Sequence, residues 1–255
     1  MATAYPPTAL RYKRLSALTA ERSVRESRKV RRRGAGAVYT VLVAHQVAQA
    51  RLAEDATALM LAEQRAEVAP VAPLNPAAFT TAPDSLADML AGIETDLAFT
   101  QLVASLTQDA GRAAQGVAQA ARPGVGWTRV LTPPSCSRCA VLAGRVYRYS
   151  DAFLRHPRDD CTTVATREGN AAFVTDPVDL ARRGEVTGLS KADMQALDDG
   201  ADFGQVVNVR NRAGLTESGR VLTRAGRPTP EGIYRQASNR DEALELLTKH
   251  RYLAS

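Results

Sequence analysis

Hydrophobic and polar positions follow a helical period over most of the first 121 residues. Across residues 37–69, "AVYTVLVAHQVAQARLAEDATALMLAEQRAEVA", apolar residues recur at spacings of three and four, which places them on one face of an amphipathic helix. The prolines that follow cannot donate the next helical hydrogen bond. A second helical period covers residues 84–121, and its apolar face holds Leu86, Met89, Leu90, Ile93, Leu97 and Val103.

The pattern changes after residue 121. Residues 122–170 hold the sole tryptophan, four prolines and short β-branched pieces, which predicts a compact irregular module. Beyond it, Ser190 and Thr229 precede predicted helices, whereas "FGQVVNVRN" (203–211) predicts a strand. We therefore expect a mainly α protein in three parts. These are a helical N-terminal region (1–121), a small module (122–170) and a short α+β tail (171–255).

Composition adds an expectation about location. Hydrophobic residues make up 45% of the chain, mean hydropathy is −0.23, and no apolar run approaches the roughly 20 residues that span a bilayer. The N-terminus lacks the charged-then-apolar order of a secretory signal. We expect a soluble protein with no membrane partner, made in a reducing cytoplasm.

The net charge of +6 is concentrated in one segment. Residues 11–33 hold ten cations and two acids, and the cations recur at helical spacings. A helix that is basic on most sides binds polyanions well, and arginine suits bidentate phosphate contacts. The segment is consistent with non-specific binding of double-stranded DNA, with an acidic protein partner or with a solvated helix. The predicted nucleic-acid-binding residues are Arg11, Lys13, Arg14, Arg22, Arg25, Arg28, Lys29, Arg31, Arg32 and Arg33.

All three cysteines lie within "CSRCAVLAGRVYRYSDAFLRHPRDDC", residues 136–161. Cys136 and Cys139 have the spacing at which a tight turn points two thiolates at one tetrahedral ion. A small loop-rich module has little core of its own, so the pattern predicts a structural zinc site. Buried cysteines that act as small hydrophobes, or a redox Cys-x-x-Cys, are the alternatives. The predicted ligands are Cys136, Cys139, His156 and Cys161, with Asp159 or Asp160 as replacements for His156.

The segment 126–166 resembles the C-terminal signature of minor head proteins of tailed bacteriophages, the Mu F-like (phage head morphogenesis) family. In that signature a tryptophan-containing strand leads to Cys-x-x-Cys, a Leu-x-Gly turn, a tyrosine, and then His-Pro and cysteine. The chain departs from it in the wider gap between His-Pro and the last cysteine. Residues 188–214 and 229–253 resemble the tail of the actinobacterial-phage members. The matching residues are Trp127, Cys136, Cys139, Leu142, Gly144, Tyr147, His156, Pro157 and Cys161.

The resemblance implies a structural virion protein of the head interior. Such a protein associates with the portal or the major capsid protein, and it assists head assembly or delivery of the packaged DNA. Because some relatives are labelled capsid maturation proteases, a protease is the alternative, and a zinc-module nuclease is a weaker one. Neither His45 nor His250 accompanies a nucleophile elbow of the G-x-S-x-G kind, and no phosphate-binding glycine loop is found. We therefore expect no catalysis.

Overall fold

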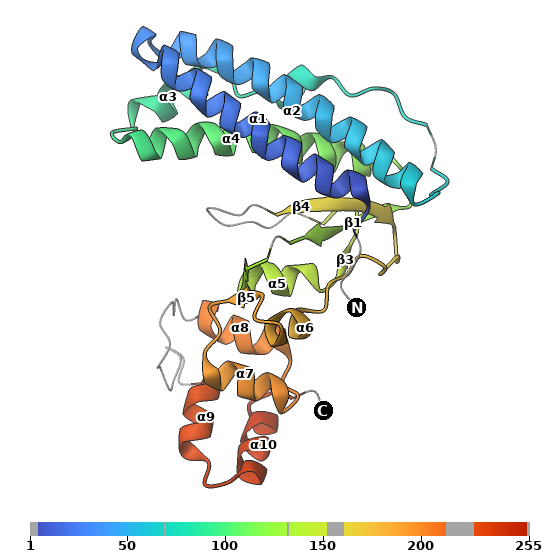
Figure 1. Ribbon diagram of the computed structural model, residues 1–255, viewed down its shortest axis with the longest axis vertical. Helices are drawn as coiled ribbons and strands as arrows, with labels where there is room; N and C mark the ends of the chain where they lie inside the picture. The colour runs from blue at the N-terminus through green and yellow to red at the C-terminus, as the bar shows by residue number, and fades with distance from the viewer. Residues whose placement is uncertain (1–4, 69, 132, 152–160, 213–226, 254–255) are drawn as a thin grey trace.

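The computed structural model describes residues 5–68, 70–131, 133–151, 161–212 and 227–253, without the side chains of 210–212. Figure 1 shows long helices at one end of the molecule, a small sheet beside them, and short helices at the other end. Helices dominate, so the predicted mainly α fold class is confirmed. No helix among the described residues is long and apolar enough to cross a membrane.

Three long helices, α1, α2 and α4, pack against one another as a bundle (Figure 1). The predicted second helical stretch over residues 84–121 is two helices, because residues 92–95 break it and Thr95 caps a new start. The Thr95 hydroxyl accepts a hydrogen bond from the backbone N–H of Ala98 at 3.0 Å. The elements are α1 (Pro7–Val30), η1 (Arg31–Arg33), α2 (Ala35–Glu63), η2 (Pro76–Phe79), α3 (Pro83–Ala91) and α4 (Asp96–Ala120).

The packing faces of these helices differ in character. Helices α2, α3 and α4 share an apolar cluster of Val38, Leu42, Leu86, Phe99 and Val103. Helix α1 instead buries small and polar side chains, which recur at spacings of three and four: Ala9, Tyr12, Ala20, Ser23 and Ser27. This inner face carries no cation, and the cations of α1 lie on its other sides.

Polar contacts fix α1 against its neighbours. The hydroxyl of Thr107 on α4 donates to that of Ser23 at 2.9 Å, and the amide of Gln49 on α2 donates to the Ser16 hydroxyl. Gly111 lets the helices approach closely, since a Cβ there would lie 2.7 Å from Cγ of Gln49. Small residues at the contact thus position α1 at short range.

A three-stranded antiparallel sheet lies against the bundle (Figure 1). Its order is β3–β1–β4, with β1 (Val125–Val130), β3 (Val146–Tyr147) and β4 (Thr162–Arg167). Trp127 pairs with Tyr147 on one side and with Ala165 on the other. The outer edge of β4 is covered by side-chain amides: Gln115 donates to the carbonyl of Thr163 at 3.2 Å, and Gln64 to that of Ala165 at 2.7 Å. These bonds satisfy an edge that would otherwise invite further strands.

The C-terminal region is mostly helical and has one buried core, which includes Leu180, Leu197, Ile233, Leu247 and Tyr252. The predicted capping residues are confirmed at Ser190, which forms a capping box with Asp193, and at Thr229. A short parallel pair, β2 with β5, joins this region to the module before it. The elements are β2 (Ser135–Cys136), α5 (Ser137–Ala143), α6 (Pro177–Arg182), β5 (Val186–Thr187), α7 (Lys191–Asp198), α8 (Phe203–Arg212), α9 (Pro230–Gln236) and α10 (Arg240–Lys249).

The strand predicted over residues 203–211 is wrong, because these residues form helix α8. Phe203, Val206 and Val207 are buried in the C-terminal core, and their spacing of three and four is helical. The Asp202 carboxylate accepts the backbone N–H of Gln205 at 2.8 Å, which caps the first turn. The valines had favoured a strand, but the burial period and the cap decide for a helix.

Candidate functional site

Two of the residues that match the phage signature form an aromatic stack inside the sheet. The rings of Trp127 on β1 and Tyr147 on β3 lie 4.0 Å apart between centroids, at an interplanar angle of 6°. The Tyr147 hydroxyl donates to the carbonyl of Leu142, at the end of α5, at 2.7 Å. Both rings are at most 3% exposed. The stack therefore ties two strands to the helix that begins with the cysteines.

The cysteines mark the start of that helix. The Cys136 side chain accepts the backbone N–H of Cys139 at 3.4 Å, and so caps α5. Cys139 and Cys161 are buried in the C-terminal core, and Cys136 packs against the same cluster. All three are thiols. The fold thus brings the three predicted sulfur ligands into one packed region.

The described residues do not by themselves assemble a metal site. Among them, no three His, Cys, Asp or Glu side chains are grouped so as to hold an ion. His156 lies outside the described residues, as do Asp159 and Asp160. Cys136 is the N-cap of α5 and Cys139 lies in its first turn, and the zinc site remains a prediction.

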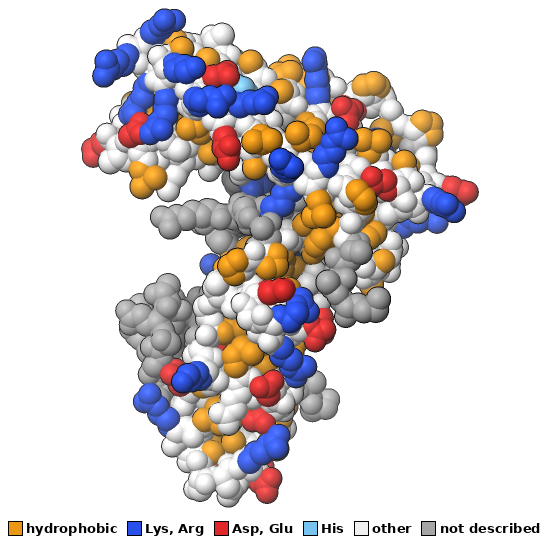
Figure 2. Space-filling model, viewed as in Figure 1, with side chains coloured by type: hydrophobic (Ala, Val, Ile, Leu, Met, Phe, Trp, Pro, Cys, Tyr) orange, Lys and Arg blue, Asp and Glu red, His pale blue; other side chains and the backbone are white. Residues whose placement is uncertain are grey.

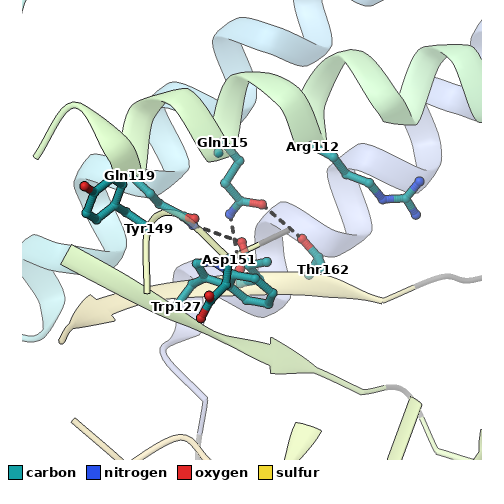
Figure 3. A pocket seen from close by; sticks show the side chains of 9 residues that line it. Arg112, Gln115, Gln119, Trp127, Tyr149, Asp151 and Thr162 are labelled. Carbon is teal, nitrogen blue, oxygen red and sulfur yellow. Dashed lines mark hydrogen bonds between the residues drawn. The ribbon is translucent and has the colours of Figure 1, made fainter. Parts of the chain in front are cut away.

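A small cavity of about 160 Å³ lies between α4 and the sheet (Figure 3). Gln115 and Gln119 point from α4 toward the sheet, and Gln119 donates to the Thr163 hydroxyl at 3.0 Å. Trp127 and Asp151 line the opposite side. Glutamines at i and i+4 on an alanine-rich helix were the sequence signal for this polar face, which our sequence reasoning missed. The Asp151 carboxylate accepts the backbone N–H of Arg148 at 2.9 Å, and the hydroxyls of Thr163 and Thr162 contact Gln119 and Gln115.

The predicted nucleic-acid-binding residues fall into two groups. Eight of the ten cations are exposed. One of them, Arg28, is ion-paired, and six of the other seven recur along the side of α1 and η1 opposite its buried face. None of the seven forms an ion pair within the described part of the chain. Lysine and arginine side chains gather over this end of the molecule in Figure 2. We call this group the cationic ridge: Arg11, Arg14, Arg22, Arg25, Lys29, Arg32 and Arg33.

The other three cations contact the bundle. Arg28 forms an ion pair with Asp96, at the first turn of α4. Arg31 lies 3.5 Å from Asp96 and its guanidinium stacks 4.5 Å from the centre of the Phe99 ring. Lys13 is half-buried and lines a cavity of about 100 Å³ between α1 and α4. Arg28 and Arg31 thus link α1 and η1 to α4.

The histidines outside the cysteine segment have structural roles. Nε2 of His45 lies 2.9 Å from Oε2 of Glu26, which links α2 to α1. This hydrogen bond is the main reason that the pKa of Glu26 is lowered from its ordinary value near 4.5. His250 is the C-cap of α10, and burial together with Lys249 and Arg227 lowers its pKa.

Comparison with known proteins adds no neighbour. No family model, no curated protein and no solved structure matches the chain. Its class is therefore defined by the fold alone: a mainly α protein in which a helical bundle and a C-terminal helical region flank a small antiparallel sheet.

Proposed function

We propose that the chain is a structural minor head protein of a tailed bacteriophage, located in the head interior and made in the host cytoplasm. The observation that carries the proposal is the spatial grouping of the residues that match the signature of this family. Trp127 stacks on Tyr147, Tyr147 bonds to the Leu142 carbonyl, and Cys136 caps the helix that holds Cys139. Those members of the pattern that the structure describes thus lie in packed contact, although they are scattered along the sequence.

The burial and internal contacts of these residues favour a structural role. Gly144 lies against Pro177, since a Cβ there would be 3.3 Å from the proline Cδ, so the Leu-x-Gly turn is an internal contact. Trp127, Cys139, Tyr147 and Cys161 are all at most 4% exposed. Side chains buried to this degree pack the module together. A zinc ion bound by the predicted ligands would add folding free energy to this module.

The partners that suit this role are the portal, the major capsid protein and packaged DNA. The experiment mixes the purified full-length chain with the portal and the capsid precursor of the same phage, and follows co-sedimentation and the size of the precursor. We expect the chain to sediment with one of these assemblies while the precursor keeps its size. Specific cleavage of the precursor would establish the protease alternative instead. Absence of association with either protein would contradict the proposal.

A further inference from the structure

Charge divides the bundle into two unlike parts. Residues 11–33 hold ten cations and two acids, whereas residues 34–121 hold three cations and nine acids. Exposed acids of the second part include Asp84, Asp88 and Glu94 on and after α3. A polyanion is therefore attracted to the α1 side of the bundle and repelled by the remainder.

The cationic ridge is straight and long enough to follow a duplex. Arg11, Arg14, Arg22, Arg25 and Lys29 share one side of α1 because their spacings are multiples of three and four residues along a continuous helix. At a rise of about 1.5 Å per residue, the ridge from Arg11 to Arg32 is roughly 30 Å long. One turn of B-form DNA is about 34 Å.

We propose that the cationic ridge binds the phosphate backbone of double-stranded DNA, with α1 still docked on the bundle and the acidic helices turned away. This inference deepens the proposed function and rests on it for the source of the DNA. Arginine predominates in the ridge, and its planar fork matches phosphate oxygens. The ridge lacks the apolar, aromatic centre of a protein interface, since Leu18 is its main apolar member.

Two of the predicted cations are not counted in the ridge because they contact α4. Arg28 and Arg31 are held by Asp96 and Phe99, and releasing them would leave the first turn of α4 without its partners. Binding by the ridge carries no base sequence information, because the ridge offers cations and no aromatic side chain for stacking.

The test measures affinity of the full-length chain for a random-sequence duplex of about three helical turns, between about 50 and 200 mM salt. The ridge variant carries Arg11→Gln, Arg14→Gln, Arg22→Gln and Arg25→Gln. A control variant of equal net charge carries Arg51→Gln, Arg138→Gln, Arg167→Gln and Arg235→Gln, which are exposed outside α1. Circular dichroism of both variants verifies that helix content is kept.

We expect the log of affinity to fall with the log of salt at a slope near −6, at about 0.9 for each of seven contacts. The ridge variant should flatten the slope by about 3 to 4, and the control variant by less than about one. Equal flattening by both variants, or no binding of the duplex by the wild-type chain, would overturn the inference. So would tighter binding of polyglutamate than of the duplex at the same salt. Any of these results leaves the head location to be decided by its own measurement.

Discussion

Glycine at position 126 is required by the close approach of two strands. A Cβ at Gly126 would lie 2.3 Å from the backbone oxygen of Tyr147, a distance at which a strand must move. Because Gly126 precedes Trp127, such a movement would also separate the Trp127–Tyr147 stack. Gly126 thus allows the contact between Trp127 and Tyr147, two residues that match the family signature.

We predict that Gly126→Ala lowers the free energy of unfolding by about 1–3 kcal/mol, the range for overpacked sites. Gly116→Ala is the matched control. Gly116 lies on α4 with no atom within 4 Å of the position of a Cβ, so helix propensity should make this change neutral or stabilising by up to about 1 kcal/mol. Urea denaturation measures both. Equal effects of the two changes would show that the Tyr147 contact is unimportant.

The three cysteines lead to a prediction about zinc binding. Cys136 and Cys139 lie on one helix turn, and Cys161 belongs to the same packed region. We expect protein purified without chelator to contain about one zinc per chain, because four ligands close a structural site. Cys136→Ser should remove the zinc and unfold the module while the helical bundle keeps its circular dichroism, whereas His156→Ala should leave partial affinity.

Elemental analysis of the zinc content and titration of the thiols together test this prediction. If the folded protein contains no zinc and all three thiols react with a thiol reagent, the cysteines serve as small buried hydrophobic residues and the metal prediction is wrong.

At the scale of elements, the docking of α1 depends on polar contacts. Its buried face offers alanine, serine and one tyrosine, so little apolar area holds it. Contacts at both ends supplement this face: the Thr8 hydroxyl donates to Glu63, and Glu26 contacts His45. The Arg28–Asp96 ion pair adds a third link. The stability of α1 should therefore respond to pH.

The pH dependence has a definite sign. The pKa of Glu26 is lowered chiefly by its hydrogen bond with His45, so its contribution to stability is present above pH 4.5 and is lost as pH falls through the lowered value. We expect Glu26→Gln to lower the unfolding temperature at pH 6, and the difference from wild type to shrink as the medium becomes more acidic than pH 4.5. His45→Gln should remove the same pH-dependent difference. A difference that is constant down to pH 3 would contradict this role of the hydrogen bond.

The sequence predicted which segments are helical better than it predicted how they pack. The long helices and the caps at Ser190 and Thr229 follow from local chemistry, which acts within one turn. The inner face of α1 was missed because serine and alanine do not stand out in a hydrophobicity pattern, although they are buried at helical spacing. Helix α8 was missed because valine favours strands, while the burial of its apolar face in the C-terminal core is a tertiary effect.

The sequence also predicted only part of the candidate functional site. Residue spacing predicted the cysteine pair and the basic segment, both of which are local in sequence. It did not separate the ridge from Arg28 and Arg31, because their partner Asp96 lies more than 60 residues away. Nor did it predict the Trp127–Tyr147 stack, which requires the register of β1 with β3.

At the scale of the whole molecule, the sheet connects two helical regions of different character. The bundle carries the cationic ridge, and the C-terminal region has its own core around Leu197 and Leu247. Trp127, Cys136, Cys139 and Tyr147, which match the phage signature, lie at the junction, where β1 contacts both α4 and α5. This arrangement is consistent with our proposal that the chain links partners, in which the bundle would bind DNA and the C-terminal region would bind the portal or capsid.

The central claim is that the chain is a component of the phage head interior. The most direct measurement is quantitative mass spectrometry of purified, DNA-filled particles, treated with an external protease before and after the heads are opened. We predict that the chain is present in intact particles, resists the protease while the head is closed, and is digested once it is open. Absence of the chain from purified particles, or its digestion on closed heads, would contradict the account.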